Sequence, residues 1–175
     1  MPIAKGVHKV LYFRKLGEAT DAAKLVFQTE HIKSYSRERE KTSTKDGDVS
    51  GSGSLEDEVS ISALQAESDP TFTMLSDSIV DDFPVEMWEV DLADKQGTEP
   101  GSITFGAEYR QGYITEWETT NPTEDDPEVE GTFITEFKRQ KGRVTLPEGD
   151  MQTLQYVFHD VLAADPADDG LTPTP

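Results

Sequence analysis

The alternation of hydrophobic and polar residues predicts a mainly β chain. Residues 7–14 and 85–92 are rich in β-branched and aromatic side chains, which favour strands. We expect residues 24–28 to return beside the first of these strands, after a break at Gly17. In the second strand the apolar phase shifts at Met87-Trp88, which predicts either a bulge or burial on both faces.

Two hairpins are predicted nearer the C-terminus. Residues 103–109 and 113–117 alternate on either side of 110–112, which we expect to turn the chain. Residues 132–138 and 143–146 are expected to flank a similar turn.

Three other segments complete the prediction for this half. The turn of the second hairpin is expected at 140–142, and an acidic loop at 121–127. Residues 148–162 carry both helical and strand signals, and we expect a short helical turn that runs into a strand.

One helix is predicted, with clear start and stop signals. Asp69 is a suitable N-cap and Pro70 a suitable first helical residue, and Pro84 is expected to end the helix. An apolar stripe follows at helical spacing, made of Phe72, Leu75, Ile79 and Phe83. The helix should therefore cover one side of a β core.

Residues 34–67 are the most unusual part of the pattern. Residues 34–44 contain no Gly or Pro and residues 58–64 alternate, so we expect a long polar hairpin. Its tip is expected between Lys45 and Ser54, where Gly, Ser and Asp cluster. Strands that are polar on both faces usually acquire partners from another chain. A disordered acidic loop is the alternative interpretation.

The charge distribution favours association between copies. The formal net charge is −19, yet residues 1–45 hold ten basic and five acidic side chains, whereas residues 46–135 hold two and twenty-three. A basic end and an acidic middle favour head-to-tail contact of identical chains. The acidic middle argues against tight binding of nucleic acid. The chain has no cysteine, so we expect folding in a reducing cytoplasm, and no apolar run predicts a membrane span.

No residue pattern indicates catalysis, a cofactor or a firm metal site. The three histidines are scattered, and no nucleophile or phosphate-binding motif occurs. A weak match to a calcium-binding loop has four potential ligands, Asp46, Asp48, Ser50 and Asp57. Because its flanks indicate strands, a hairpin tip is the better interpretation. We therefore predict a protein that is not an enzyme. The alternative function is a surface or binding module, with calcium held in that loop.

Five stretches together carry a resemblance to a known family. They are FQTEH at 27–31, TKDG at 44–47, VEMWEVD at 85–91, KGRVTL at 141–146 and QYVFHDV at 155–161. Their order and spacing are similar to those of the major tail proteins, or tail tube proteins, of long-tailed non-contractile phages that infect Gram-positive bacteria. We accordingly expect one tail tube β domain at residues 1–162 and a flexible tail at 163–175.

The resemblance implies a fold, a location and a set of partners. The fold would be a β-sandwich or barrel with one flanking α-helix, in which the polar hairpin completes an inner barrel shared by several subunits. Six copies would form a ring in the virion tail. Stacked rings would enclose a tape measure protein and later conduct DNA without binding it, with tail terminator and distal tail proteins at the ends.

The resemblance also assigns roles to residues of the hairpin. A loop that reaches the next ring would contain Thr44, Lys45, Asp46, Gly47, Asp48, Gly51 and Gly53. Candidates for the inner barrel are Arg37, Glu38, Arg39, Glu40, Glu58 and Ser60.

Alternation along residues 33–41 separates the charges of the first hairpin strand. One face carries the basic residues Lys33, Arg37, Arg39 and Lys41, and the other carries Glu38 and Glu40. We expect the basic set to pair with acids on neighbouring strands or subunits, and the two glutamates to lie nearer the lumen. An acidic lumen repels phosphate and would ease the transit of DNA.

Overall fold

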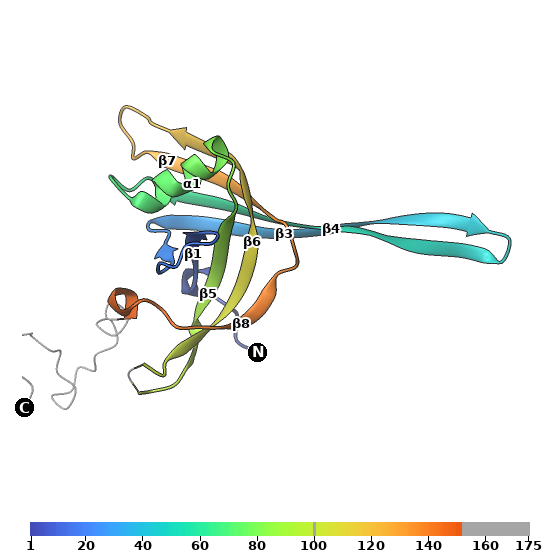
Figure 1. Ribbon diagram of the computed structural model, residues 1–175, viewed down its shortest axis with the longest axis horizontal. Helices are drawn as coiled ribbons and strands as arrows, with labels where there is room; N and C mark the ends of the chain where they lie inside the picture. The colour runs from blue at the N-terminus through green and yellow to red at the C-terminus, as the bar shows by residue number, and fades with distance from the viewer. Residues whose placement is uncertain (100, 152–175) are drawn as a thin grey trace, which may run out of the picture.

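A single, strongly curved antiparallel sheet forms the body of the chain (Figure 1). The computed structural model describes residues 1–99 and 101–151. The strands follow the spatial order β2-β1-β5-β6-β7-β4-β3, and β8 pairs with the first half of β6. Their bounds are β1 (Lys9–Lys15), β2 (Ala23–Lys24), β3 (Gln28–Thr44), β4 (Gly47–Leu64), β5 (Val85–Gln96), β6 (Thr104–Thr120), β7 (Glu128–Thr135) and β8 (Gln140–Val144). A 3-10 turn, η1 (Gly6–His8), precedes β1. The mainly β prediction is confirmed.

The long polar hairpin is present as β3 and β4, and its distal half projects far from the body (Figure 1). We call residues 37–55 the arm. The predicted tip was too long, because β4 already begins at Gly47. A Cβ on Gly53 would approach the carbonyl oxygen of Glu38 to 2.6 Å, so this glycine permits close strand contact at a bulge. It does not mark a turn.

The helix α1 (Pro70–Val80) closes one end of the curved sheet and confirms the predicted helix. The Asp69 carboxylate accepts a hydrogen bond from the backbone N–H of Thr71 at 2.8 Å, as an N-cap does. The helix ends four residues before Pro84, and Asp82 adopts a left-handed backbone conformation with φ of 53°. Leu75 is fully buried, so the apolar stripe faces the core.

The body sheet is buried on both of its faces, which explains the phase shift at Met87-Trp88. The strand pairing passes through these residues without interruption, and the irregularity of β5 lies between Asp91 and Lys95. The larger core, on the concave face, includes Leu11, Phe13, Val59, Ile61, Leu75, Met87 and Phe133. The smaller core, on the opposite face, includes Tyr12, Val90, Ile103, Phe105 and Leu146.

The first of the two predicted C-terminal hairpins is wrong. Residues 104–120 form the single strand β6, and Arg110, placed in a turn by the sequence, is completely buried. Gly112 is the reason for the error. A Cβ there would lie 1.9 Å from the carbonyl oxygen of Ile134, so the glycine serves the close approach of β7 rather than a reversal of the chain.

The second predicted hairpin is also wrong, and the early return strand expected at residues 24–28 is confirmed only in part, because Lys24 pairs with β1 as expected. β7 ends at Thr135, and β8 pairs with β6 rather than with β7. Only two residues, Ala23 and Lys24, pair with β1 before Phe27 takes a left-handed conformation and β3 begins. The acidic loop at 121–127 is confirmed.

Two predictions fall wholly or partly outside the described residues. Residues 148–151 are helical, in agreement with the expected helical turn, and the rest of that segment is not described. The tail expected at 163–175, and the boundary at 162, also lie beyond the described part. Within it, no helix has the length and apolar character that crossing a membrane requires.

We predict that Leu75→Ala lowers the free energy of unfolding by about 2–5 kcal/mol, because it leaves a cavity in the larger core. Val80→Ala on the same helix is the control, since Val80 is 80% exposed and its truncation should change stability by less than about 0.5 kcal/mol. Urea unfolding of dilute protein measures both. Equal stability of the two variants would mean that the helix does not pack as described.

Candidate assembly surface

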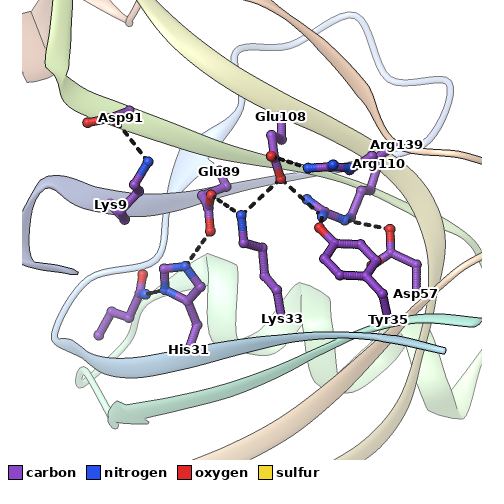
Figure 2. Close-up of polar contacts among 11 residues, drawn as sticks. Lys9, His31, Lys33, Tyr35, Asp57, Glu89, Asp91, Glu108, Arg110 and Arg139 are labelled. Atoms are coloured by element: carbon purple, nitrogen blue, oxygen red, sulfur yellow. Dashed lines mark hydrogen bonds and ion pairs between the residues drawn. The ribbon is translucent and has the colours of Figure 1, made fainter. Parts of the chain in front are cut away.

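The base of β3 meets β5 and β6 through charged side chains (Figure 2). Lys33 Nζ donates to Glu89 Oε1 at 2.8 Å and to Glu108 Oε2 at 3.0 Å. His31 Nε2 lies 2.5 Å from the other oxygen of Glu89, and Gln28 holds the opposite ring nitrogen. Because β3 alternates, His31 and Lys33 point to the concave face of the sheet, where these acids lie.

Arg110 extends this network toward the arm (Figure 2). Its Nε donates to Asp57 Oδ2 at 3.0 Å, and its Nη2 donates to the Tyr35 hydroxyl at 2.6 Å. Glu108 accepts from Arg110 and also pairs with Arg139. The Arg139 guanidinium stacks over the Tyr35 ring at 5.1 Å. The network thus fixes the place where the arm leaves the body.

Glu89 and Glu108 stay ionised in spite of burial. Burial alone would raise the pKa of Glu89, but hydrogen bonds from His31 and Lys33 outweigh it and lower the pKa to about 2. The pKa of Glu108 is likewise lowered, because the hydrogen bond from Lys33 and the charges of Lys33, Arg110 and Arg139 outweigh burial. A lysine that bridges two such carboxylates holds β3 in one position.

The backbone of β3 is left free along its outer edge. β3 pairs with β4 only, and no other described strand lies beside it. β6 has a second open edge, because β5 pairs with it only as far as Gly112 and the residues from 113 to 120 pair with β7 alone. Each edge presents a row of unpaired N–H and C=O groups, which is a template for a strand from another chain.

The four strands between these edges share an acidic outer face. The register of the strand pairs identifies which residues of β3, β4, β7 and β6 face away from the buried core. None of the residues at these positions is Lys or Arg, and nine are glutamates: Glu30, Glu38, Glu40, Glu56, Glu58, Glu116, Glu118, Glu128 and Glu130. A shallow hollow of about 660 Å³ on this face is lined by Glu30, Glu116, Glu118 and Glu130.

The predicted inner-barrel residues divide between the two sides of the hairpin. Glu38, Glu40, Glu58 and Ser60 lie on the acidic outer face. Arg37 and Arg39 lie on the other side, where Arg37 donates to Ser52 Oγ at 3.2 Å and to the Gly53 carbonyl oxygen at 3.0 Å. Of the basic set, Lys33 pairs with acids on other strands of the same chain, as expected.

The residues expected to reach a next ring all lie in the exposed distal arm, but only Lys45 and Asp46 are outside the strands. Thr44 Oγ1 donates to the Gly47 carbonyl oxygen at 2.6 Å, which closes the turn. Asp48 and Gly51 belong to β4 and pair with β3, and Gly53 lies at the bulge of β4. The inter-ring segment is therefore a two-stranded ribbon, and its role in stacking stays a prediction.

The structure does not bring the four calcium-loop candidates together. Asp46 and Asp48 are at the exposed tip, while Asp57 is buried and bonded to Arg110. The extended strand between Asp48 and Asp57 spans roughly 30 Å. Among residues 1–99 and 101–151, no group of three or more His, Cys, Asp or Glu side chains has an arrangement suited to a metal ion.

Sequence reasoning missed the network residues Asp57, Glu89, Glu108, Arg110 and Arg139. One signal was available in β5, where Glu86 and Glu89 interrupt an apolar run and turn out to be buried. A charged residue inside a buried strand needs a partner of opposite sign. The partners come from segments distant in sequence, so periodicity alone could not identify them.

Comparisons with known proteins identify relatives of this architecture. The family model of the phage tail tube protein matches residues 3–140. A tail protein of Staphylococcus phage phiMR25 is 31% identical over 160 residues, covering 90% of this chain and 82% of that protein.

Two solved structures share the fold. The SPP1 tail tube, determined by solid-state NMR and cryo-EM, has a TM-score of 0.70 at 16% identity and covers 99% of this chain and 95% of its own. The tail of an empty gene transfer agent particle, refined with C6 symmetry, has a TM-score of 0.57 at 10% identity, with 80% and 99% covered.

We predict that Glu89→Gln destabilises the chain near neutral pH and flattens its acid dependence. The folded pKa of Glu89, about 2, lies below its unfolded value of 4.5, so its stabilisation is present above pH 5 and is lost as the pH falls toward 2. For the wild type this carboxylate contributes on the order of 3 kcal/mol between those limits.

Unfolding free energies from urea titrations between pH 2.5 and 7 measure this effect. Glu99→Gln, at an exposed turn residue, is the control and should follow the wild-type curve. A Glu89→Gln curve with the same slope as the wild type would contradict the network.

Proposed function

The chain belongs to the phage tail tube protein family, and we propose that copies of it close into rings by pairing the free edge of β3 with the open edge of β6 in the next copy. The family makes it a structural component of the virion tail. The observation that carries the proposal is the presence of two different open edges on one sheet. Contact between unlike edges is heterologous, and such contacts form a closed ring when the rotation between copies closes.

The number of copies per ring is proposed to be six. Support comes from the tail of the gene transfer agent particle, which was refined with C6 symmetry and shares the fold of this chain. Each copy would contribute the four strands β3, β4, β7 and β6 to a continuous inner barrel. A closed barrel removes both open edges, and it therefore also removes the tendency of each edge to pair at random.

The acidic outer face of these strands is proposed to line the channel. Nine glutamates without a single Lys or Arg at the alternating positions give this face one sign of charge. A negative wall repels the phosphates of DNA, so that DNA passes without adsorption. We propose that the same channel holds a tape measure protein before ejection. Tail terminator and distal tail proteins would bind the ends of stacked rings, and the chain would be made in the host cytoplasm.

The absence of cysteine permits a direct test of ring closure. Ser34→Cys on β3 is combined with one of Glu116→Cys, Glu118→Cys or Thr120→Cys on β6, all on the outer face. Within one chain, the three strand spacings between β3 and β6 hold these positions roughly 14 Å apart, too far for a disulfide. Mild oxidation should therefore give a ladder of covalent oligomers that ends at six for at least one pair.

The matched control pairs Ser34→Cys with Ser102→Cys, which lies in the turn between β5 and β6 and should give no ladder. Electron microscopy of the same samples establishes whether rings and tubes are present. Tubes in which none of the three edge pairs cross-links would show that rings close through other surfaces.

Charge reversal tests the lumen. We predict that tubes of wild-type protein do not retain double-stranded DNA at physiological salt, whereas Glu116→Lys/Glu118→Lys tubes do. Binding by the variant should weaken steeply as salt rises, because each phosphate contact releases counterions. Filter binding over a salt series measures this. The control, Glu67→Lys/Glu99→Lys, makes the same charge change outside the acidic face, and DNA retention by it would contradict the assignment.

A further inference from the structure

One side of the arm carries an excess of exposed positive charge, because Asp48 is the one acid of the arm strands that shares this side with three basic residues. Arg37, Arg39 and Lys41 alternate along this side of β3, and their cross-strand neighbours are Leu55, Ser52 and Ser50. Arg39 and Lys41 form no ion pair with any described residue. This basic side is therefore a sheet face for which the described chain supplies no partner.

A complementary charge lies at the opposite end of the body. The loop between β6 and β7 presents Glu124, Asp125 and Asp126, all exposed and none paired with a described basic residue. β4 pairs with β7 from Glu58 near the arm to Leu64 near this loop. The arm and the loop consequently point away from each other, as Figure 1 also shows.

This placement prevents the two charged surfaces from meeting within one chain. The paired part of β4 alone holds them roughly 20 Å apart, since a strand rises about 3.3 Å per residue. Two copies in line, with the arm end of one against the loop end of the other, bring the surfaces together. The basic side of the arm and the acidic loop are then complementary partners from successive copies.

We propose that the basic side of the arm docks on the β6–β7 loop of a second copy, in the adjoining ring of the stack. This inference rests on the proposed tube and adds the surface that receives the arm. Arg39 and Lys41 lie two and four residues beyond the base of the arm, roughly 7 and 13 Å along the strand. A loop at the abutting end of the next copy is within that reach, while the tip continues over its body.

Charge exchange between the two surfaces tests the proposal. The arm variant is Arg39→Glu/Lys41→Glu, the loop variant is Asp125→Lys/Asp126→Lys, and the third protein carries all four changes. Each double variant should raise the protein concentration needed for tube growth by at least about tenfold, because like charges then face each other. The fourfold variant should return to within about threefold of the wild type, since the pairs are restored with exchanged sign.

The matched control restores net charge without restoring the contact. It combines the loop variant with Lys5→Glu/Lys95→Glu, at two exposed lysines outside the arm, and it should remain as defective as the loop variant alone. Pelleting assays and electron microscopy measure tube growth. Covalent ring closure through the cysteine pair of β3 and β6 shows that each variant still folds and forms rings.

The outcomes separate this inference from the function on which it rests. Rings without tubes for each double variant, and tubes again for the fourfold variant, support the docking. If the fourfold variant forms tubes no better than the double variants, the arm docks elsewhere and the inference fails. The inference also fails if the control forms tubes as well as the fourfold variant does. If wild-type protein forms neither rings nor tubes, the proposed function fails and the inference fails with it.

Discussion

Charged side chains, rather than backbone hydrogen bonds, hold β3 against β5 and β6, whereas β4, the second strand of the hairpin, joins the body through its backbone pairing with β7. Lys33 bridges Glu89 and Glu108, and Arg110 joins Asp57 to Tyr35, so β3 is fixed beside β5 and β6 without entering their ladder. Removing one partner of such a buried pair is costly, which makes the arrangement specific. Had the backbone of β3 paired with the open edge of β6 in the same chain, the barrel would have closed within one chain and left no edge for a neighbouring copy.

Charged side chains protect the open edges of β3 and β6 against unwanted pairing. Glutamates line the outer face of both edges, with Glu30 and Glu38 on β3 and Glu116 and Glu118 on β6. Their mutual repulsion opposes casual pairing of single chains, as charges on exposed edges do in other β proteins. Ring formation must therefore be favoured by many contacts at once. The segregation of charge that was visible in the sequence has this physical meaning in the fold.

Local sequence signals predicted those features that depend on interactions within a single helix or strand. The N-cap at Asp69, the apolar stripe of α1 and the polar alternation of β3 were all readable, because each depends on neighbours within one element. The errors at the hairpin tip and at residues 110–112 came from Gly53 and Gly112, whose role is to let another strand approach. The buried ion network was invisible for a related reason. Its members are brought together by the curvature of the sheet, and 53 positions separate Asp57 from Arg110.

The alternation of side chains along β3 also limits how the arm can change its length. A single inserted residue between Lys33 and Arg37 would carry every side chain beyond it to the opposite side of the ribbon. Glutamates would then turn toward the side now occupied by Arg39 and Lys41. The hairpin can therefore lengthen or shorten only in steps of two residues per strand, or through a compensating bulge like the one at Gly53. Related chains with arms of different reach should therefore differ by an even number of residues per strand, except where a bulge compensates for an odd one.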